Sequence, residues 1–146
     1  MKTSKYLIIS FLLLSSCGLN LDIEKRNYKL INNSGIELRI EFYSSNSFKY
    51  SKIVNNEGIL EARAKEPSNV GIIPSSAFIA DSIIVSYENE KRQIYTRISR
   101  ENWQNVNPKL RNILEDDSYS IDSEGTYIFT FTEEDYQNAE KLLMAD

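Results

Sequence analysis

The chain contains 146 residues, of which 17 are Lys or Arg, 21 are Asp or Glu and none is His. This length suits one domain, and 41% hydrophobic with 26% charged residues indicates a globular rather than a disordered chain. The lack of His excludes a Ser-His-Asp triad and removes the commonest metal ligand. The single Cys excludes an internal disulfide and a Cys-based zinc cluster, and the 5 Gly form no phosphate-binding loop.

The first residues have the pattern of an export signal. Lys2 and Lys5 precede a predominantly apolar run from Tyr6 to Leu14, and small residues follow it. A basic start, a short apolar run and small residues before a cut site are typical of secretory signal peptides. The run is much shorter than the roughly 20 residues that span a bilayer as a helix. We therefore predict that residues 1–16 form a signal peptide that is cleaved.

The end of this run is Leu14-Ser15-Ser16-Cys17. It resembles the lipobox of bacterial lipoproteins, in which Leu and two small residues lead into a Cys. The resemblance covers residues 1–17 only. It implies diacylglyceryl transfer to the Cys17 sulfur, cleavage between Ser16 and Cys17, and acylation of the new amino group, which together anchor a protein more firmly than one myristoyl chain. The alternative is an ordinary secreted protein with an incidental Cys.

The residues after Cys17 concern the choice of membrane and the link between the anchor and the folded domain. Residue 18 is Gly rather than Asp, which under the sorting rule of enteric lipoproteins favours the outer over the inner membrane and leaves the leaflet open. Residues 17–27 lack a sustained period, and we interpret them as the lipidated Cys and a flexible tether. Ten such residues reach about 16–19 Å root-mean-square. The folded domain is then expected to occupy residues 28–146.

From Tyr28 onward the pattern is that of β-structure. Ile36, Leu38, Ile40 and Phe42 alternate with polar or aromatic residues, as in a strand with one buried face. Turn-forming residues recur about every ten positions, which is typical of an antiparallel β-sandwich or barrel. The expected strands are 28–31, 36–43, 48–54, 59–64, a short edge strand at 70–73, 82–87, 92–97, 119–121 and 126–131.

Two segments depart from the β pattern. Asn107 and Pro108 suit the N-cap and first position of a short helix that ends near residue 114. A second helix is predicted over about residues 133–144, because Thr132 suits the N-cap and Asp135 the capping-box position. The fold class expected is therefore mainly β, with a short C-terminal helix.

Charge is distributed unevenly along the chain. Residues 25–114 hold 14 basic and 9 acidic side chains, whereas residues 115–146 hold 1 basic and 10 acidic. The acidic segment could pack against the basic body or keep the domain soluble; it could also bind a basic partner or a cation. Nucleic-acid binding is not expected, because an exported anionic chain lacks the basic patch that it requires.

Acidic side chains near residue 120 make a weak candidate for calcium. The segment 115–124 holds five carboxylates, among them Asp116, Asp117, Asp122 and Glu124. Calcium takes six to eight oxygen ligands in flexible geometry. The spacing does not match an EF-hand loop, so a solvated acidic turn is the alternative. No other metal and no cofactor is expected.

Paired carboxylates could also support glycosidase-like hydrolysis without His. The candidates are Asp116, Asp117, Glu133 and Glu134. Acids at a helix start are equally explained by the helix dipole, and adjacent acids point apart. Catalysis by this chain is therefore not the leading hypothesis.

Trp103 stands among amides, with Asn102 and Asn105 beside it. An aromatic ring flanked by amides suits stacking on a sugar, whereas the alternative is a Trp that folds back to close one end of the domain. The leading hypothesis is a lipid-anchored envelope lipoprotein that acts as a non-enzymatic binding or assembly-accessory module. Its expected partners are the membrane and another envelope protein, ahead of a glycan; a small surface hydrolase or a glycan-binding module is the alternative.

Overall fold

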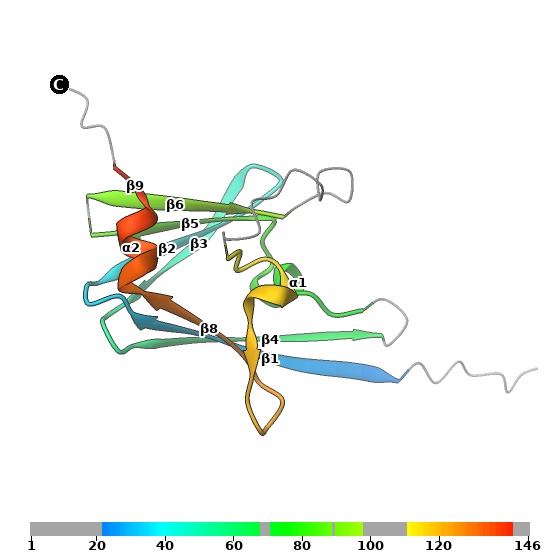
Figure 1. Ribbon diagram of the computed structural model, residues 1–146. Helices are drawn as coiled ribbons and strands as arrows, with labels where there is room; N and C mark the ends of the chain where they lie inside the picture. The colour runs from blue at the N-terminus through cyan, green and yellow to red at the C-terminus, as the bar shows by residue number, and fades with distance from the viewer. Residues whose placement is uncertain (1–21, 68–70, 89, 98–110, 142–146) are drawn as a thin grey trace, which may run out of the picture.

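The computed structural model describes residues 22–67, 71–88, 90–97 and 111–141. These residues form two β-sheets packed face to face, with short helical segments in the connections between strands (Figure 1). We call the sheet with strand order β4-β1-β8-β7 sheet A, and the sheet with order β3-β2-β5-β6-β9 sheet B. The fold is a mainly β sandwich, as expected.

The strands are β1 (Ile23–Asn33), β2 (Leu38–Ser44), β3 (Ser47–Val54), β4 (Ile59–Pro67), β5 (Ser82–Tyr87), β6 (Lys91–Thr96), β7 (Ser120–Ile121), β8 (Tyr127–Thr132) and β9 (Glu140–Lys141). The helices are α1 (Pro74–Phe78), α2 (Glu133–Asn138) and the 3-10 helix η2 (Asp116–Ser118). The expected hairpin around residues 88–91 is confirmed as β5 and β6, which pair antiparallel from Ser82↔Thr96 to Tyr87↔Lys91.

One strand pair departs from the antiparallel expectation. β1 and β8 pair in parallel, from Tyr28↔Tyr127 to Asn33↔Thr132, while β1 pairs antiparallel with β4 on its other side. No tight turn joins β1 to β8, which lie far apart in the sequence, so a parallel pairing is sterically open to them. The sandwich is therefore antiparallel except at this pair.

The core lies between the two sheets and follows the alternation along each strand. On β2, for example, Leu38, Ile40 and Phe42 point inward and are fully buried. Phe78 of α1 stacks on Phe42 with ring centroids 5.7 Å apart, so α1 covers one end of the core. The other large and fully buried side chains are Tyr28, Leu30, Ile72, Ile83, Tyr87, Ile113, Phe129 and Phe131.

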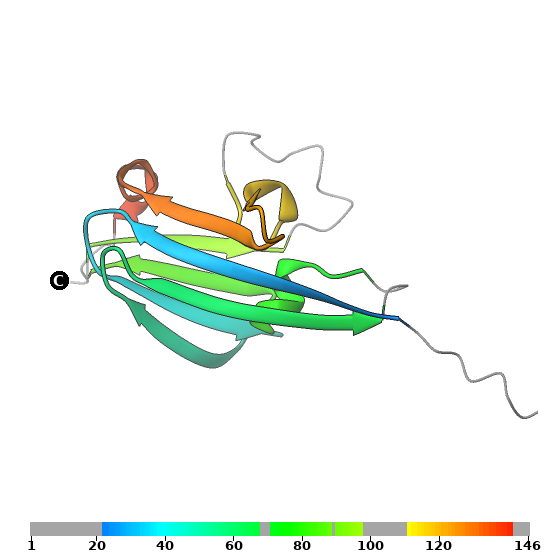
Figure 2. The ribbon, with the colours of Figure 1, turned by 90° about the horizontal axis from the view of Figure 1, so that it is seen from below.

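The first strand begins earlier than predicted. β1 begins at Ile23 rather than near Tyr28, because residues 23–27 pair with residues 63–67 of β4. Glu24 and Arg26 occupy the inward-facing positions of this part of β1, and charged residues on both faces hide the period-2 signal. Figure 2 shows β1 and β4 extending together beyond the other strands. Residues 17–21 lie outside the described part of the chain.

The C-terminal helix is also shorter than predicted. Its capping box is confirmed, since Asp135 Oδ2 accepts hydrogen bonds from the Thr132 amide at 2.7 Å and the Thr132 hydroxyl at 3.0 Å. The helix ends at Asn138, and Ala139 is extended, because the chain then pairs with β6 as the two-residue strand β9. Residues 142–144 lie outside the described residues.

Two further local predictions do not hold where the structure describes them. Residues 111–114 of the helix expected at 107–114 are not helical: the chain turns at 112–115, where the Glu115 amide donates to the Asn112 carbonyl at 3.0 Å. Asn112 Oδ1 also accepts the Leu114 amide at 3.0 Å and so competes with helical hydrogen bonding. Residues 71–73 of the edge strand expected at 70–73 pair with no strand and lead into α1. Residues 107–110 and residue 70 lie outside the described residues.

Candidate functional site

Several of the predicted site residues lie outside the described residues. These are the lipidation and cleavage positions, Cys17 and Ser16, and the sugar-binding candidates, Asn102, Trp103 and Asn105. The structure therefore gives no geometry for the lipid anchor or the Trp103 segment. In the part of the chain that it describes, no helix is long and apolar enough to cross a membrane.

Asp116, the first calcium candidate, is bound by the chain itself. Its two carboxylate oxygens accept hydrogen bonds from Arg26 Nη1 and the Tyr28 hydroxyl, each at 3.1 Å. Arg26 also donates to Glu24 Oε1 at 2.8 Å and to the Ile72 carbonyl at 2.9 Å. Burial, followed by the charge of Asp116, raises the pKa of Tyr28 above its usual range. Asp116 thus holds η2 against β1.

The other calcium candidates do not join it. Asp122 Oδ1 accepts the amides of Glu124 and Thr126, both at 2.9 Å, and so closes the turn between β7 and β8. Within the described ranges, no three Asp, Glu or Cys side chains lie close enough to hold a metal ion. The structure therefore does not bring Asp116, Asp117, Asp122 and Glu124 together as a cation site.

The hydrolase candidates form two separate pairs. Asp116 accepts a hydrogen bond from Tyr28, which pairs with the first residue of β8, and Asp117 follows it in η2. Glu133 and Glu134 instead begin α2, directly after the last residue of β8. Figure 1 shows η2 and α2 apart from each other. No cross-pair of these four acids is brought together.

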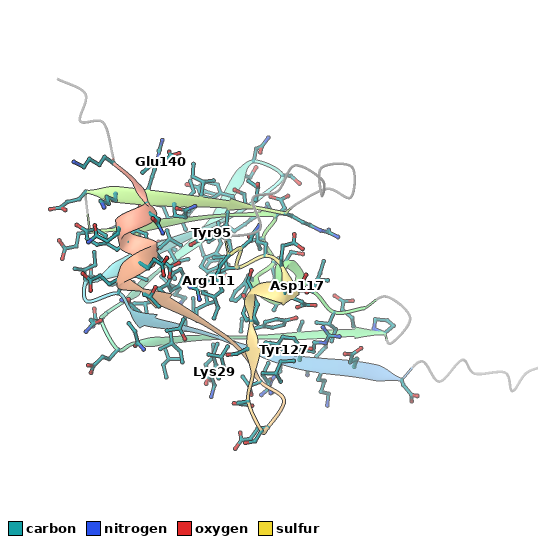
Figure 3. The ribbon with its side chains drawn as sticks, in the orientation of Figure 1. Lys29, Tyr95, Arg111, Asp117, Tyr127 and Glu140 are labelled. Carbon is teal, nitrogen blue, oxygen red and sulfur yellow. The ribbon has the colours of Figure 1, made fainter. Side chains whose placement is uncertain are left out.

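A cavity of about 220 Å³ lies between β6 and α2. Arg111 lines it together with Gln93, Tyr95 and Glu134. Arg111 Nη2 donates to Asp135 Oδ2 at 2.7 Å and to the Thr130 carbonyl at 2.5 Å, and its guanidinium lies 4.3 Å from the Phe129 ring centroid. Figure 3 shows Arg111 and Tyr95 between α2 and η2. The guanidinium of Arg111 at this cavity is thus already paired with Asp135.

The outer surface of sheet B carries several exposed hydrophobic side chains around Glu41, which lies opposite Ile84 of β5 and Ser51 of β3. Strand register places Tyr43 opposite Phe48, and Ile84 opposite Ile94, all on the side away from the core. Ile53 lies on the same side, opposite Arg39. Phe48, Ile53 and Ile94 are 55%, 59% and 47% exposed. We call these five hydrophobic residues the apolar face.

Two arginines border the apolar face. Arg39 of β2 and Arg92 of β6 both lie opposite Ser86 of β5, one on each side, and so share the outer side of sheet B. Within the described residues, neither arginine forms an ion pair. The combination of exposed aliphatic, aromatic and guanidinium groups matches the composition of protein-binding surfaces.

Sequence reasoning did not identify the apolar face, although two local signals pointed to it. Within strands, adjacent apolar residues occur in Ile83-Ile84-Val85 and in Ile53-Val54, and one member of each adjacent pair must face outward.

A scan against protein-family models finds no match for the chain, and searches of curated proteins and of solved structures find none either.

Proposed function

We propose that this protein is a lipid-anchored lipoprotein of the bacterial envelope that binds another protein through the apolar face and catalyses no reaction. The observation that carries the binding role is the apolar face itself, with Arg39 and Arg92 at its border. The observation that carries the anchor is the lipobox that ends at Cys17.

The anchor and the domain are close in the sequence. Cys17 precedes the first residue of β1, Ile23, by six positions. With Gly18 after the Cys, the proposed location is the outer membrane, with the domain held near the headgroups on either side. Acyl chains add about 0.8 kcal/mol per buried CH₂, so attachment to the bilayer would be permanent in practice.

The apolar face suits a protein partner better than a small ligand. It is a sheet surface rather than a cleft, and small-molecule sites are concave. Burial of exposed Ile and Phe contributes roughly 25 cal/mol per Å² of apolar surface. Arg39 and Arg92 add two cations to this side of the sheet, and Glu41, opposite Ile84, and Glu140, opposite Arg92, add two carboxylates. The proposed partner therefore presents an apolar patch flanked by charges of both signs.

The acids favour binding over catalysis. Asp116 is occupied by Arg26 and Tyr28, and Asp135 by Arg111 and its own capping box. A retaining or inverting glycosidase requires two carboxyl groups about 5–9.5 Å apart across a bound sugar. The division of the four candidate acids between the two ends of β8 supports the non-enzymatic role.

Cross-linking in cells tests the partner-binding role. A photoreactive benzoylphenylalanine replaces Ile94 on the apolar face or, as the control, Asn27 on the outer side of sheet A. We expect one defined protein adduct from position 94 and none from position 27. The double variant Arg39→Glu, Arg92→Glu should lower the adduct about tenfold, because it reverses both cations at the border of the apolar face and so breaks charge complementarity with the partner. Equal adducts from both faces, or no effect of the charge reversal, would contradict the proposal.

A further inference from the structure

The outer side of sheet A carries a positive surface that is near the proposed anchor. Strand register places Lys25 opposite Lys65, Asn27 opposite Arg63, and Lys29 opposite Glu61. Like charges directly opposite each other destabilise a strand pair. We call Lys25, Lys29, Arg63 and Lys65 the basic face.

Most of this charge has no counter-ion. Among the described residues, the only acid paired with the basic face is Glu61, which lies 3.5 Å from Lys29 Nζ and is 68% exposed. Arg63 Nε donates to the neutral Asn27 Oδ1 at 2.8 Å rather than to a carboxylate. Figure 3 shows Lys29 on the side of sheet A away from sheet B. The basic face therefore holds four cations against one weakly held anion.

The other acids near the basic face lie on the inward side of the sheet, before β1 or at the rim of the groove. Glu24 and Glu66 lie opposite each other on the inward side, and Glu24 is paired with Arg26. Asp22 precedes the strand. Glu124 borders the same open groove as Lys29 and Arg63, at its far side on the turn between β7 and β8. The positive charge is thus concentrated on the outer side of β1 and β4.

The position of the basic face suggests its partner. Six residues of chain span at most about 22 Å, and Lys25 lies two residues, about 7 Å, beyond the start of β1. If Cys17 carries the lipid, the basic face is held within reach of the headgroup layer. Attraction between exposed charges acts over about 8–10 Å at physiological salt, so a tether this short makes contact frequent.

On the basis of the proposed lipid anchor, we propose that the basic face docks on anionic phospholipid headgroups and orients the domain on the membrane. Each Lys or Arg near an anionic surface strengthens binding about fivefold. The two outer sides of a sandwich point in opposite directions, so docking through sheet A turns the apolar face of sheet B toward its protein partner.

Site-specific quenching tests this orientation in the full lipidated protein. Because Cys17 would carry the lipid, a second Cys can be labelled alone with a fluorophore, at Asn27→Cys beside the basic face or at Ser51→Cys on the outer side of sheet B. The protein is reconstituted in vesicles of neutral phosphatidylcholine, with or without about 30% phosphatidylglycerol, that carry a headgroup quencher. We expect quenching at position 27 to exceed that at position 51 several-fold in anionic vesicles, and to be similar at both positions in neutral vesicles.

Charge variants complete the test. Lys25→Glu with Lys65→Glu should abolish the difference between the two labels, whereas the matched double variant Arg39→Glu, Arg92→Glu should retain it. Raising the salt to about 0.5 M should also remove it, because screening shortens the range of the attraction. Equal quenching at both positions in anionic vesicles would overturn the docking proposal. A protein without lipid on Cys17 would instead overturn the proposed anchor, so the two failures are distinguishable.

Discussion

The side chain of Asn32, near the end of β1, donates a hydrogen bond of 2.8 Å to the backbone carbonyl of Val54, at the end of β3, and so joins sheet A to sheet B. It also donates to the Ile36 carbonyl at 2.7 Å, and its Oδ1 accepts the Ser34 hydroxyl at 2.7 Å. Asn32 is fully buried with its amide group satisfied. Asn32 therefore connects the two chain segments that pass from one sheet to the other, between β1 and β2 and between β3 and β4.

Replacing Asn32 by Ala should destabilise the domain by about 2–4 kcal/mol, because the change removes the hydrogen bonds that its buried amide makes with the Val54 and Ile36 carbonyls and with Ser34. The matched control is Asn33→Ala at the exposed neighbouring position, which should change the free energy of unfolding by less than about 0.5 kcal/mol. Urea denaturation followed by fluorescence measures both. Equal effects of the two substitutions would show that Asn32 does not connect the sheets.

Asp116→Asn should destabilise the domain by about 1–2 kcal/mol, because it weakens the ion pair with Arg26 and the hydrogen bond from Tyr28. Asp117→Asn, at an exposed position of the same 3-10 helix, is the control and should be nearly neutral. Thermal unfolding is measured with and without calcium. We expect no rise in Tm on calcium addition; a rise that Asp117→Asn abolishes would instead identify a calcium site.

Tyr87 and Tyr28 should respond in opposite ways to loss of the hydroxyl. Within the described residues, the buried Tyr87 hydroxyl makes no hydrogen bond of standard geometry and has only a weak interaction with the Tyr95 hydroxyl to replace its lost hydration. Tyr87→Phe should therefore be neutral or stabilise the domain by up to about 1 kcal/mol, whereas Tyr28→Phe should cost about 1 kcal/mol through the lost bond to Asp116. Urea midpoints decide this, and the prediction fails if Tyr87→Phe is the more harmful substitution.

Stability should fall in alkaline solution. Burial is the main cause that raises the pKa values of Tyr28, Tyr87 and Tyr119 above the ordinary value of 10.0. A tyrosine whose pKa is higher in the folded than in the unfolded state contributes stability below pH 10, and this contribution is lost as the pH rises above it. We expect a steady urea midpoint from about pH 8 to 9.5 and a decline above about pH 10, reduced in Tyr119→Phe. A midpoint unchanged up to about pH 11.5 would contradict this.

Local signals in the sequence predict the local elements well. The β5–β6 hairpin and the capping box of Thr132 and Asp135 depend on residues within one turn or one helix start, so the sequence specifies them directly. The parallel β1–β8 pair and the start of β1 at Ile23 depend on partners far along the chain, which period-2 patterns do not identify.

The same distinction applies to the candidate sites. The carboxylates of 115–124 suggest a cation site when counted along the chain, but the partner of Asp116 is Arg26, on a strand 90 residues earlier. The apolar face needs the register of four strands before Phe48, Ile53 and Ile94 are seen to share one surface. The spacing of these residues along the sequence does not reveal which residues of neighbouring strands lie opposite each other.

Both the proposed membrane location and the proposed docking of the basic face depend on a lipid at Cys17. Intact mass spectrometry of the protein extracted from bacterial membranes, grown with labelled palmitate, tests it directly. We expect a chain that begins at Cys17 and carries the mass of a diacylglyceryl group and the label, and a Cys17→Ala variant that lacks both. A chain that is cleaved elsewhere, or that begins at Cys17 without added lipid, would contradict the proposed anchor.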